Sequence, residues 1–234
     1  MPGDPVLIEA DDVSKVYRVG EVSVSALKSV NLRVARGEFT AIAGPSGSGK
    51  STLLNILSGL DSPTSGRVSL AGTPISGMGG RALSDFRRDH IGFVFQAFNL
   101  IPVLTVLENI EYVLLLQGVS RHDRRERVRE MLSTVGLEGM EDRRPPQLSG
   151  GQQQRVAVAR AMVSRPDLIL ADEPTANLDS ATGGALLDLM RELNERRRMT
   201  FLFSSHDRMI MDRAKRLVVL KDGSLVQDVT RNGA

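Results

Sequence analysis

An eight-residue segment, Gly44–Ser51, constrains the fold and chemistry of this 234-residue chain more than any other feature. It matches the pattern G-x-x-x-x-G-K-[ST], follows the apolar run Phe39–Ala43 and precedes an amphipathic helical pattern that begins near Lys50. In such a loop, successive backbone N–H groups point inward at phosphate oxygens, and the positive N-terminus of the next helix adds to the attraction. The bare pattern arises by accident only about once in a hundred chains of this length, so a plain glycine-rich turn is the weaker interpretation. The segment therefore predicts a nucleoside triphosphate site.

The last residues of this segment predict how the nucleotide is held. Lys50 brings a positive charge to the β- and γ-phosphates, and Ser51 offers a hydroxyl to Mg²⁺, an ion that prefers oxygen ligands. We therefore expect ATP and Mg²⁺ as ligands. The residues expected to bind ATP here are Gly44, Pro45, Ser46, Gly47, Ser48, Gly49, Lys50, Ser51 and Thr52.

Two carboxylates follow the apolar run Leu168–Ala171. At the carboxyl end of a core strand, Asp172 is expected to face the Mg²⁺ site. Glu173 alternates away from it, in a position to polarise a water in line with the γ-phosphate. On its own, this pair is more typical of a polar strand terminus. The upstream phosphate loop makes a role in Mg²⁺ binding and hydrolysis the favoured interpretation.

Two further polar residues also follow strand candidates. Gln96 comes directly after Ile91–Phe95, and His206 comes after Thr200–Ser204. An amide at a strand end can contact Mg²⁺ or water, although a lone glutamine or histidine is more often structural. The three histidines are far apart in the sequence, which argues against a metal cluster.

The pattern of strands and helices predicts an α/β fold. The length fits one large domain or a core with an inserted subdomain. Residues 6–43 are expected to form strands, and 97–165 a helical insertion. The remaining predicted strands are Val68–Leu70, Leu168–Ala171, Thr200–Ser204 and a hairpin of Leu217–Lys221 with Ser224–Asp228 around Asp222-Gly223. The remaining predicted helices are Val106–Leu116, Arg124–Val135, one from Ser149 and one over Ala181–Arg197, with a loop over Gly72–Gly80.

Composition excludes several classes of function. The chain has no cysteine, so it has no disulfide framework and no thiolate metal site. The net charge of +2 gives no electrostatic sign of a nucleic-acid partner. No apolar run approaches the roughly 18–20 residues that span a bilayer, so any membrane role is expected to be peripheral. The basic segment Arg121–Arg129 contains interleaved glutamates, which favours a solvated helix face over a site for acidic lipids or a partner.

The segment Leu148-Ser149-Gly150-Gly151-Gln152 adds a more specific signal. Ser149 is a good N-cap for the helix that follows, and a helix N-terminus is also an anion site. Together with the phosphate loop, Gln96, Asp172-Glu173 and His206, in that order, this segment resembles the nucleotide-binding subunit of ABC transporters. The resemblance extends from about residue 6 to residue 228. It implies a P-loop NTPase core, formed by residues 1–96 and 166–234, with an N-terminal antiparallel β-subdomain and a helical signature subdomain at 97–165.

The resemblance also implies a role for each motif. Two such chains pair head to tail when ATP is bound, and the signature segment of one contacts ATP in the other. The signature residues are Ser149, Gly150, Gly151 and Gln152. Tyr17 would stack on adenine, and Asp179 would signal across the dimer. Glu173 would be the catalytic carboxylate, and His206 would contact the γ-phosphate. Gln96 would link Mg²⁺ and water to an integral membrane permease, a separate chain that would hold this subunit peripherally at the cytoplasmic face of the inner membrane.

The segment Ala171–Asp179 narrows the resemblance. It reads A-D-E-P-T-A-N-L-D and is similar to the lipoprotein-release and macrolide-exporter subgroup, with Ala176 in place of the usual glycine. The segment Ser204-Ser205-His206 also differs from the commoner V-T-H. This subgroup implies an ATPase that powers export or lipoprotein release. The alternative is an ATPase that signals to an envelope or cell-division enzyme without moving a solute. DNA-repair ATPases with the same signature need a long coiled-coil insertion, for which residues 97–165 are too few.

Overall fold

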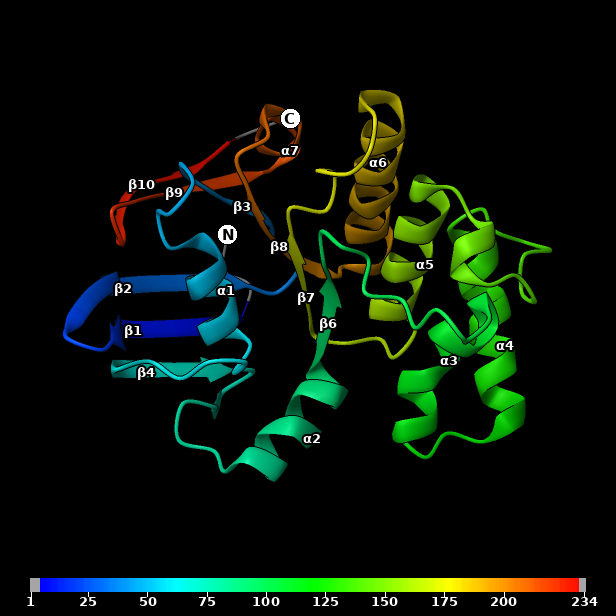
Figure 1. Cartoon of the computed structure of the whole chain (residues 1–234), viewed down its shortest axis with the longest axis horizontal. Coiled ribbons are helices and arrows are strands. Elements are labelled where there is room, and N and C mark those ends of the chain that lie inside the picture. Colours follow the sequence, from blue (N-terminus) through cyan, green and yellow to red (C-terminus); the bar gives the residue numbers. More distant parts are fainter. Residues whose placement is uncertain (1–4, 232–234) are drawn as a thin grey trace.

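Two β-sheets and seven α-helices make up the computed structural model, which describes residues 5–231 (Figure 1). The larger sheet has the order β10-β9-β3-β8-β7-β6, in which every neighbouring pair is parallel except the β9–β10 hairpin. The smaller sheet is antiparallel, with the order β2-β1-β4-β5. The strands of the larger sheet are β3 (Phe39–Ala43), β6 (Ile91–Val94), β7 (Leu168–Asp172), β8 (Thr200–Ser205), β9 (Arg216–Lys221) and β10 (Ser224–Thr230). Those of the smaller sheet are β1 (Val6–Val19), β2 (Val22–Ala35), β4 (Ser65–Leu70) and β5 (Thr73–Pro74).

The helices lie on both sides of the larger sheet. Figure 1 shows the antiparallel sheet on one side of the molecule and α3, α4 and α5 together on the other. The helices are α1 (Lys50–Leu57), α2 (Gly80–His90), α3 (Val106–Leu116), α4 (Arg121–Thr134), α5 (Gly150–Met162), α6 (Ser180–Arg197) and α7 (Arg208–Arg213). A short 3₁₀ helix, Pro145–Gln147, precedes α5.

Alternating side chains of the parallel strands fill two separate hydrophobic cores. On β8, Phe201 and Phe203 pack with α3–α6, whereas Leu202 packs with α1 and the antiparallel sheet. Phe39 on β3 lies against both phenylalanines, with ring centroids 5.6 and 4.6 Å apart. Each side chain of this size contributes roughly 1.5–3 kcal/mol when fully buried. Because both faces are covered, these strands are continuous apolar runs, as parallel strands usually are.

The structure confirms the α/β fold and most of the predicted elements. The strands over residues 6–43 and the hairpin around Asp222-Gly223 form as expected. Two helices, α2 and α7, were not predicted, and a two-residue strand, β5, lies within the predicted loop Gly72–Gly80. No residue of α2 is buried, and its apolar stripe is limited to Leu83 and Phe86, which pack partly buried against the core, so the sequence signal for this helix is weak. The second predicted helix of the 97–165 region begins at Arg121 instead of Arg124, because Ser120 caps it by accepting a bond from the N–H of Asp123. Among residues 5–231, no helix combines the length and apolarity needed to cross a bilayer.

Candidate active site

The phosphate loop connects the carboxyl end of β3 to the start of α1. Gly49 is the N-cap of α1 and has φ of +104°, a conformation that L side chains rarely adopt. A Cβ at this position would lie 2.5 Å from the carbonyl oxygen of Ala26. Both facts require glycine. Because glycine has no side chain, the loop can pass close to Ala26 and bring the first turn of α1 to the edge of the sheet. Within residues 5–231, no side chain caps this helix, so its N-terminal amides remain suited to an anion.

Lys50 is the first residue of α1, and its side chain reaches back to the start of the phosphate loop. Its side-chain ammonium donates to the carbonyl oxygens of Gly44 and Pro45 at 2.8 and 3.0 Å, and the residue is only 8% exposed. These bonds hold the charge beside the same amides that would bind phosphate. An ammonium has three donors, so it can also reach phosphate oxygens from this position.

Two oxygen donors meet beside the loop. The hydroxyl of Ser51, at the start of α1, donates to Oδ1 of Asp172 at 3.3 Å. Asp172 is the last residue of β7, so the predicted strand-end position is confirmed. A hydroxyl and a carboxylate are ligands that Mg²⁺ prefers, and the pair therefore fits that ion.

Glu173 is held by three donors from the end of β8. Its Oε2 accepts from the hydroxyl of Ser205 at 2.7 Å, and its Oε1 accepts from the backbone N–H of His206 at 3.2 Å. Nδ1 of His206 lies 2.7 Å from the same Oε1. Only 15% of the Glu173 side chain is exposed, compared with 72% for His206. The carboxylate is thus fixed in position while the imidazole faces solvent.

The backbone of Glu173 sets the direction of its side chain. The residue follows β7 with φ of +47°, and its N–H donates to the carbonyl oxygen of Ser204. Strand alternation, the basis of the sequence-based argument, therefore does not apply beyond Asp172. Left-handed backbone at a residue other than glycine is uncommon and is concentrated at functional sites.

One cavity of about 540 Å³ brings most of the predicted residues together. Gln96, Glu173 and His206 line it with the phosphate loop, and the backbone oxygen of Gln96 accepts from Nδ2 of Asn177 at 2.9 Å. The residues of the predicted ATP-binding segment that line the cavity are Pro45, Ser46, Gly47, Gly49, Lys50, Ser51 and Thr52. Sequence reasoning missed Ala176 and three residues of β2, which are Val24, Ser25 and Ala26. Val24 is 53% exposed, and the sequence alone gives no signal that this valine faces solvent.

Tyr17 lies on β1, outside the residues that line this cavity. Its hydroxyl donates to Oδ2 of Asp61 at 2.7 Å, and the Lys15 ammonium is 4.8 Å from the ring centroid. Burial and the hydrogen bond to Asp61 raise the pKa of Tyr17. The residue as a whole is 37% exposed, so part of it remains accessible from solvent.

The signature segment forms the N-terminus of α5, as predicted. Ser149 caps the helix by accepting from the N–H of Gln152, and the Gln152 side chain accepts from the N–H of Ser149. This reciprocal pair is a capping box. Among the described residues, none of Ser149–Gln152 lines the cavity of the same chain.

Comparison with known proteins identifies the family. The family model described as ABC transporter matches residues 27–176. The chain belongs to the ABC transporter family. An uncharacterized ABC transporter ATP-binding protein of Thermotoga maritima is 48% identical over 227 residues, covering 97% of this chain and 96% of that protein. Macrolide export ATP-binding/permease protein MacB 2 of Yersinia pestis is 42% identical over 229 residues, which are 98% of this chain but 34% of that protein.

Solved structures agree with this identification. The dimeric structure of MJ0796, an ABC transporter cassette of Methanocaldococcus jannaschii, matches with a TM-score of 0.90 and 45% identity, covering 97% of this chain and 100% of that one. A dimeric post-hydrolysis state of MJ0796 bound to ADP and Pi matches with the same TM-score and 44% identity. The predicted family, the P-loop ATPase fold and the similarity to macrolide exporters are confirmed. The chain is an ABC-type ATPase.

The signature segment packs against the start of α6, which Asp179 caps. Asp179 caps α6 by accepting from the N–H groups of Ala181 and Thr182, and it also accepts from the Thr182 hydroxyl at 2.6 Å. The methyl group of the same threonine faces Gly151 of the signature helix. A Cβ added to Gly151 would lie 2.4 Å from this methyl carbon. Gly151 therefore lets α5 pack closely against the start of α6.

We expect Gly151→Ala to destabilise the ABC subunit. The threonine cannot rotate away without breaking its bond to Asp179, so the helices must separate. The free energy of unfolding, measured by urea denaturation, should fall by about 1–3 kcal/mol.

Two variants test this cause. Gly150→Ala should not lower stability, because the nearest atoms to its Cβ would be at 3.9 Å. Adding Thr182→Ser to Gly151→Ala should restore stability, because serine lacks the methyl group and keeps the hydroxyl. Equal losses in the two glycine variants would contradict the packing argument.

Proposed function

We propose that this ABC subunit powers a separate membrane-spanning permease, for export or lipoprotein release, by closing as a homodimer around ATP. The observation that carries the proposal is the position of the Glu173 carboxylate, which three donors hold in the cavity that contains the phosphate loop. The MJ0796 cassette is dimeric, and MacB 2 combines ATP-binding and permease parts in one protein. This chain matches about a third of MacB 2, and in our proposal a second chain supplies the permease.

Hydrolysis depends on charge placed around the γ-phosphate. Lys50 and the loop amides bind the phosphates, and Ser51, Asp172 and Gln96 would hold Mg²⁺. That ion, when bound, neutralises charge that develops between the β- and γ-phosphates. Glu173 accepts a hydrogen bond from the attacking water and orients it. His206 lies next to this carboxylate and contacts the γ-phosphate.

The signature segment acts on the ATP of the partner subunit. Its capped helix N-terminus is outside the cavity of its own chain, and Ser149 is exposed. In a head-to-tail pair, Ser149, Gly150, Gly151 and Gln152 of one chain approach the γ-phosphate bound by the other. Asp179 transmits closure between the sites, because its partner Thr182 contacts Gly151.

We expect Glu173→Gln to retain ATP binding and to lose most turnover. Glutamine keeps the size of the side chain but cannot act as a base, so loss of a general base should lower kcat about 10²–10⁴-fold. Steady-state phosphate release measures turnover, and gel filtration with Mg·ATP should show the variant trapped as a dimer. The exposed Glu138→Gln is the matched control and should behave as wild type. Turnover of Glu173→Gln close to wild type would disprove the role of Glu173.

The adenine contact of Tyr17 makes a separate prediction. Tyr17→Ala should weaken ATP binding, measured by calorimetry, but leave inorganic triphosphate binding unchanged. Tyr17→Phe keeps the ring and loses only the bond to Asp61, so its ATP affinity should stay within about twofold of wild type if stacking is the interaction. An equal loss of affinity for ATP and triphosphate in Tyr17→Ala would remove the stacking assignment.

An apolar helix face supports a permease partner. Tyr112, Leu115 and Leu116 on α3 are 44%, 50% and 54% exposed. Their i, i+3 and i+4 spacing places them on one face of the helix. Exposed apolar side chains gathered in this way are typical of interaction sites. Docking through this face would hold the subunit peripherally on the cytoplasmic side of the inner membrane.

Purification from membranes tests the partner. We expect a membrane-spanning protein to co-purify and to change the rate of ATP turnover. The double variant Tyr112→Ser/Leu116→Ser should lose the co-purification and the rate change but keep its basal turnover. If the complex gates an envelope hydrolase and moves no lipid, peptide or drug, the signalling function replaces transport. If no membrane protein affects turnover, the motor proposal is wrong.

A further inference from the structure

The two carboxylate oxygens of Glu173 are held by different kinds of partner. Oε2 accepts from the hydroxyl of Ser205 at 2.7 Å. Among the described residues, Oε1 has only His206 as a side-chain or backbone partner, through the backbone N–H at 3.2 Å and Nδ1 at 2.7 Å. Ser205 and His206 differ in how far they can move, and this difference decides which oxygen can be released during hydrolysis.

The Ser205 hydroxyl is fixed in position and in direction. Ser205 is the last residue of β8, is fully buried, and lies opposite Ala43 of β3 in the parallel ladder. The N–H of Asp207 donates to its hydroxyl oxygen at 3.0 Å. A hydroxyl has one proton and an ionised carboxylate can only accept, so the proton of Ser205 is directed at Oε2 of Glu173.

Asp207, which supplies that N–H, is itself held at both carboxylate oxygens. Its Oδ1 accepts from the N–H of Met209 at 2.8 Å, in the first turn of α7. Its Oδ2 accepts from the hydroxyl of Thr175 at 3.2 Å, two residues after Glu173. The bond from Ser205 to Glu173 therefore lies within a network that joins the end of β8, the start of α7 and the loop after β7.

His206, in contrast, can leave the carboxylate. Its side chain is 72% exposed. In its contact with Oε1 the proton lies on Nδ1, because an ionised carboxylate has none to give. A neutral imidazole carries only one N–H, so its Nε2 then has a lone pair and cannot donate to a phosphate oxygen. A neutral His206 can therefore donate to the γ-phosphate only after its ring has released Oε1.

We propose that Ser205 is a positioning residue for hydrolysis: it holds Oε2 of Glu173 while His206 turns to the γ-phosphate, so that Oε1 becomes the oxygen that accepts a hydrogen bond from the attacking water. This role rests on the proposed function, in which Glu173 orients that water. Without the Nδ1 contact, Oε1 keeps the longer bond to the backbone N–H of His206, and its second lone pair is open to water. Ser205 does not line the ATP cavity, so it acts through the carboxylate.

Ser205→Thr and Ser205→Val test the hydroxyl, because the two new side chains have nearly the same shape and only threonine can donate. Threonine is also the residue of the commoner V-T-H pattern. Ser205→Thr should keep kcat within about twofold of wild type, whereas Ser205→Val should lower it about tenfold or more, because a small misplacement of a reacting group is costly. KM and the calorimetric affinity for ATP should stay within about twofold in both variants, because ATP binding does not use this hydroxyl.

Ser205→Ala makes the same comparison with wild type without adding volume to a buried position. Its kcat should fall as far as that of Ser205→Val, and both variants should persist with Mg·ATP as dimers on gel filtration, because they still bind ATP. Equal kcat in Ser205→Thr and Ser205→Val, or wild-type kcat in Ser205→Ala, would overturn the proposal. A kcat of Ser205→Ala above wild type would also overturn it, because the bond would then restrain Glu173 in a resting position.

Ser58→Ala is the matched control. Ser58 is also fully buried, and its hydroxyl accepts from the N–H of Leu60 at 3.4 Å and donates to the carbonyl oxygen of Asn55 at 2.9 Å. It does not line the ATP cavity, so kcat of Ser58→Ala should stay within about twofold of wild type. A fall in kcat equal to that of Ser205→Ala would reduce the effect to the loss of a buried hydroxyl and disprove the role of Ser205.

Glu173→Gln, measured beside these variants, separates the role of Ser205 from the proposed function. Wild-type kcat in Ser205→Ala together with lost turnover in Glu173→Gln would remove only the role of Ser205. Wild-type turnover in Glu173→Gln would remove the role of Glu173 and that of Ser205 with it.

Discussion

Burial of the six-stranded sheet on both faces is the constraint on which the rest of the structure depends. Two hydrophobic cores, one on each face, hold β3, β7 and β8 side by side and parallel. Parallel strands end at the same edge, so this packing brings together the phosphate loop after β3, Asp172 at the end of β7 and His206 after β8. Residues far apart in the sequence thereby form one site, within which long-range bonds such as that from Ser51 to Asp172 complete the arrangement.

The same packing connects the signature helix to Glu173, the carboxylate that we propose as catalytic. Gln154 on α5 is fully buried and donates to the carbonyl oxygen of Pro174 at 2.7 Å, directly after Glu173. On the neighbouring turn, Gly151 contacts Thr182, which Asp179 holds by its hydroxyl. A movement of α5 that accompanies dimer closure would reach the backbone beside Glu173 through two contacts with little freedom to yield. This gives a physical reason for the coupling that we propose between signature binding and hydrolysis.

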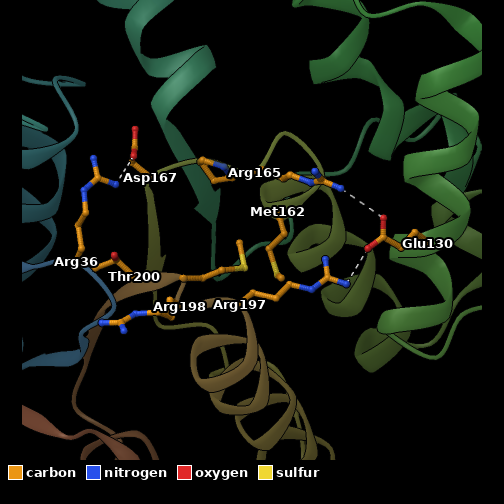
Figure 2. Close-up of a pocket in the computed structure, with 10 residues that line it drawn as sticks. Arg36, Glu130, Met162, Arg165, Asp167, Arg197, Arg198 and Thr200 are labelled. Carbon is orange, nitrogen blue, oxygen red and sulfur yellow. Dashed lines mark hydrogen bonds and ion pairs between the residues drawn. The ribbon is translucent and has the colours of Figure 1, made fainter.

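Sequence reasoning succeeded where one local rule decides the structure. Buried strands are apolar runs, Ser149 is followed by the glutamine of a capping box, and the phosphate loop has a fixed residue pattern. It failed where the answer depends on tertiary context. The apolar stripe of helix α2 is limited to Leu83 and Phe86, and the direction of the Glu173 side chain results from a left-handed backbone and the hydroxyl of Ser205. A second cavity, at the amino ends of β7 and β8, is lined by four separate segments that contribute Arg36, Glu130, residues 162–167 and residues 197–200, and no local pattern could reveal it (Figure 2).

The two edges of the sheet carry positive charge by different means. At the carboxyl edge, strands lead into helix N-termini, so backbone amides supply positive potential and a single lysine completes it. At the amino edge, helices end and their carbonyls are negative, which favours cations in the last turn, such as Arg197. This dipole effect explains basic residues at helix ends, but it does not require left-handed backbone. Arg165 and Arg198 both have left-handed backbone, with φ of +55° and +52°, so the dipole effect alone does not account for their placement.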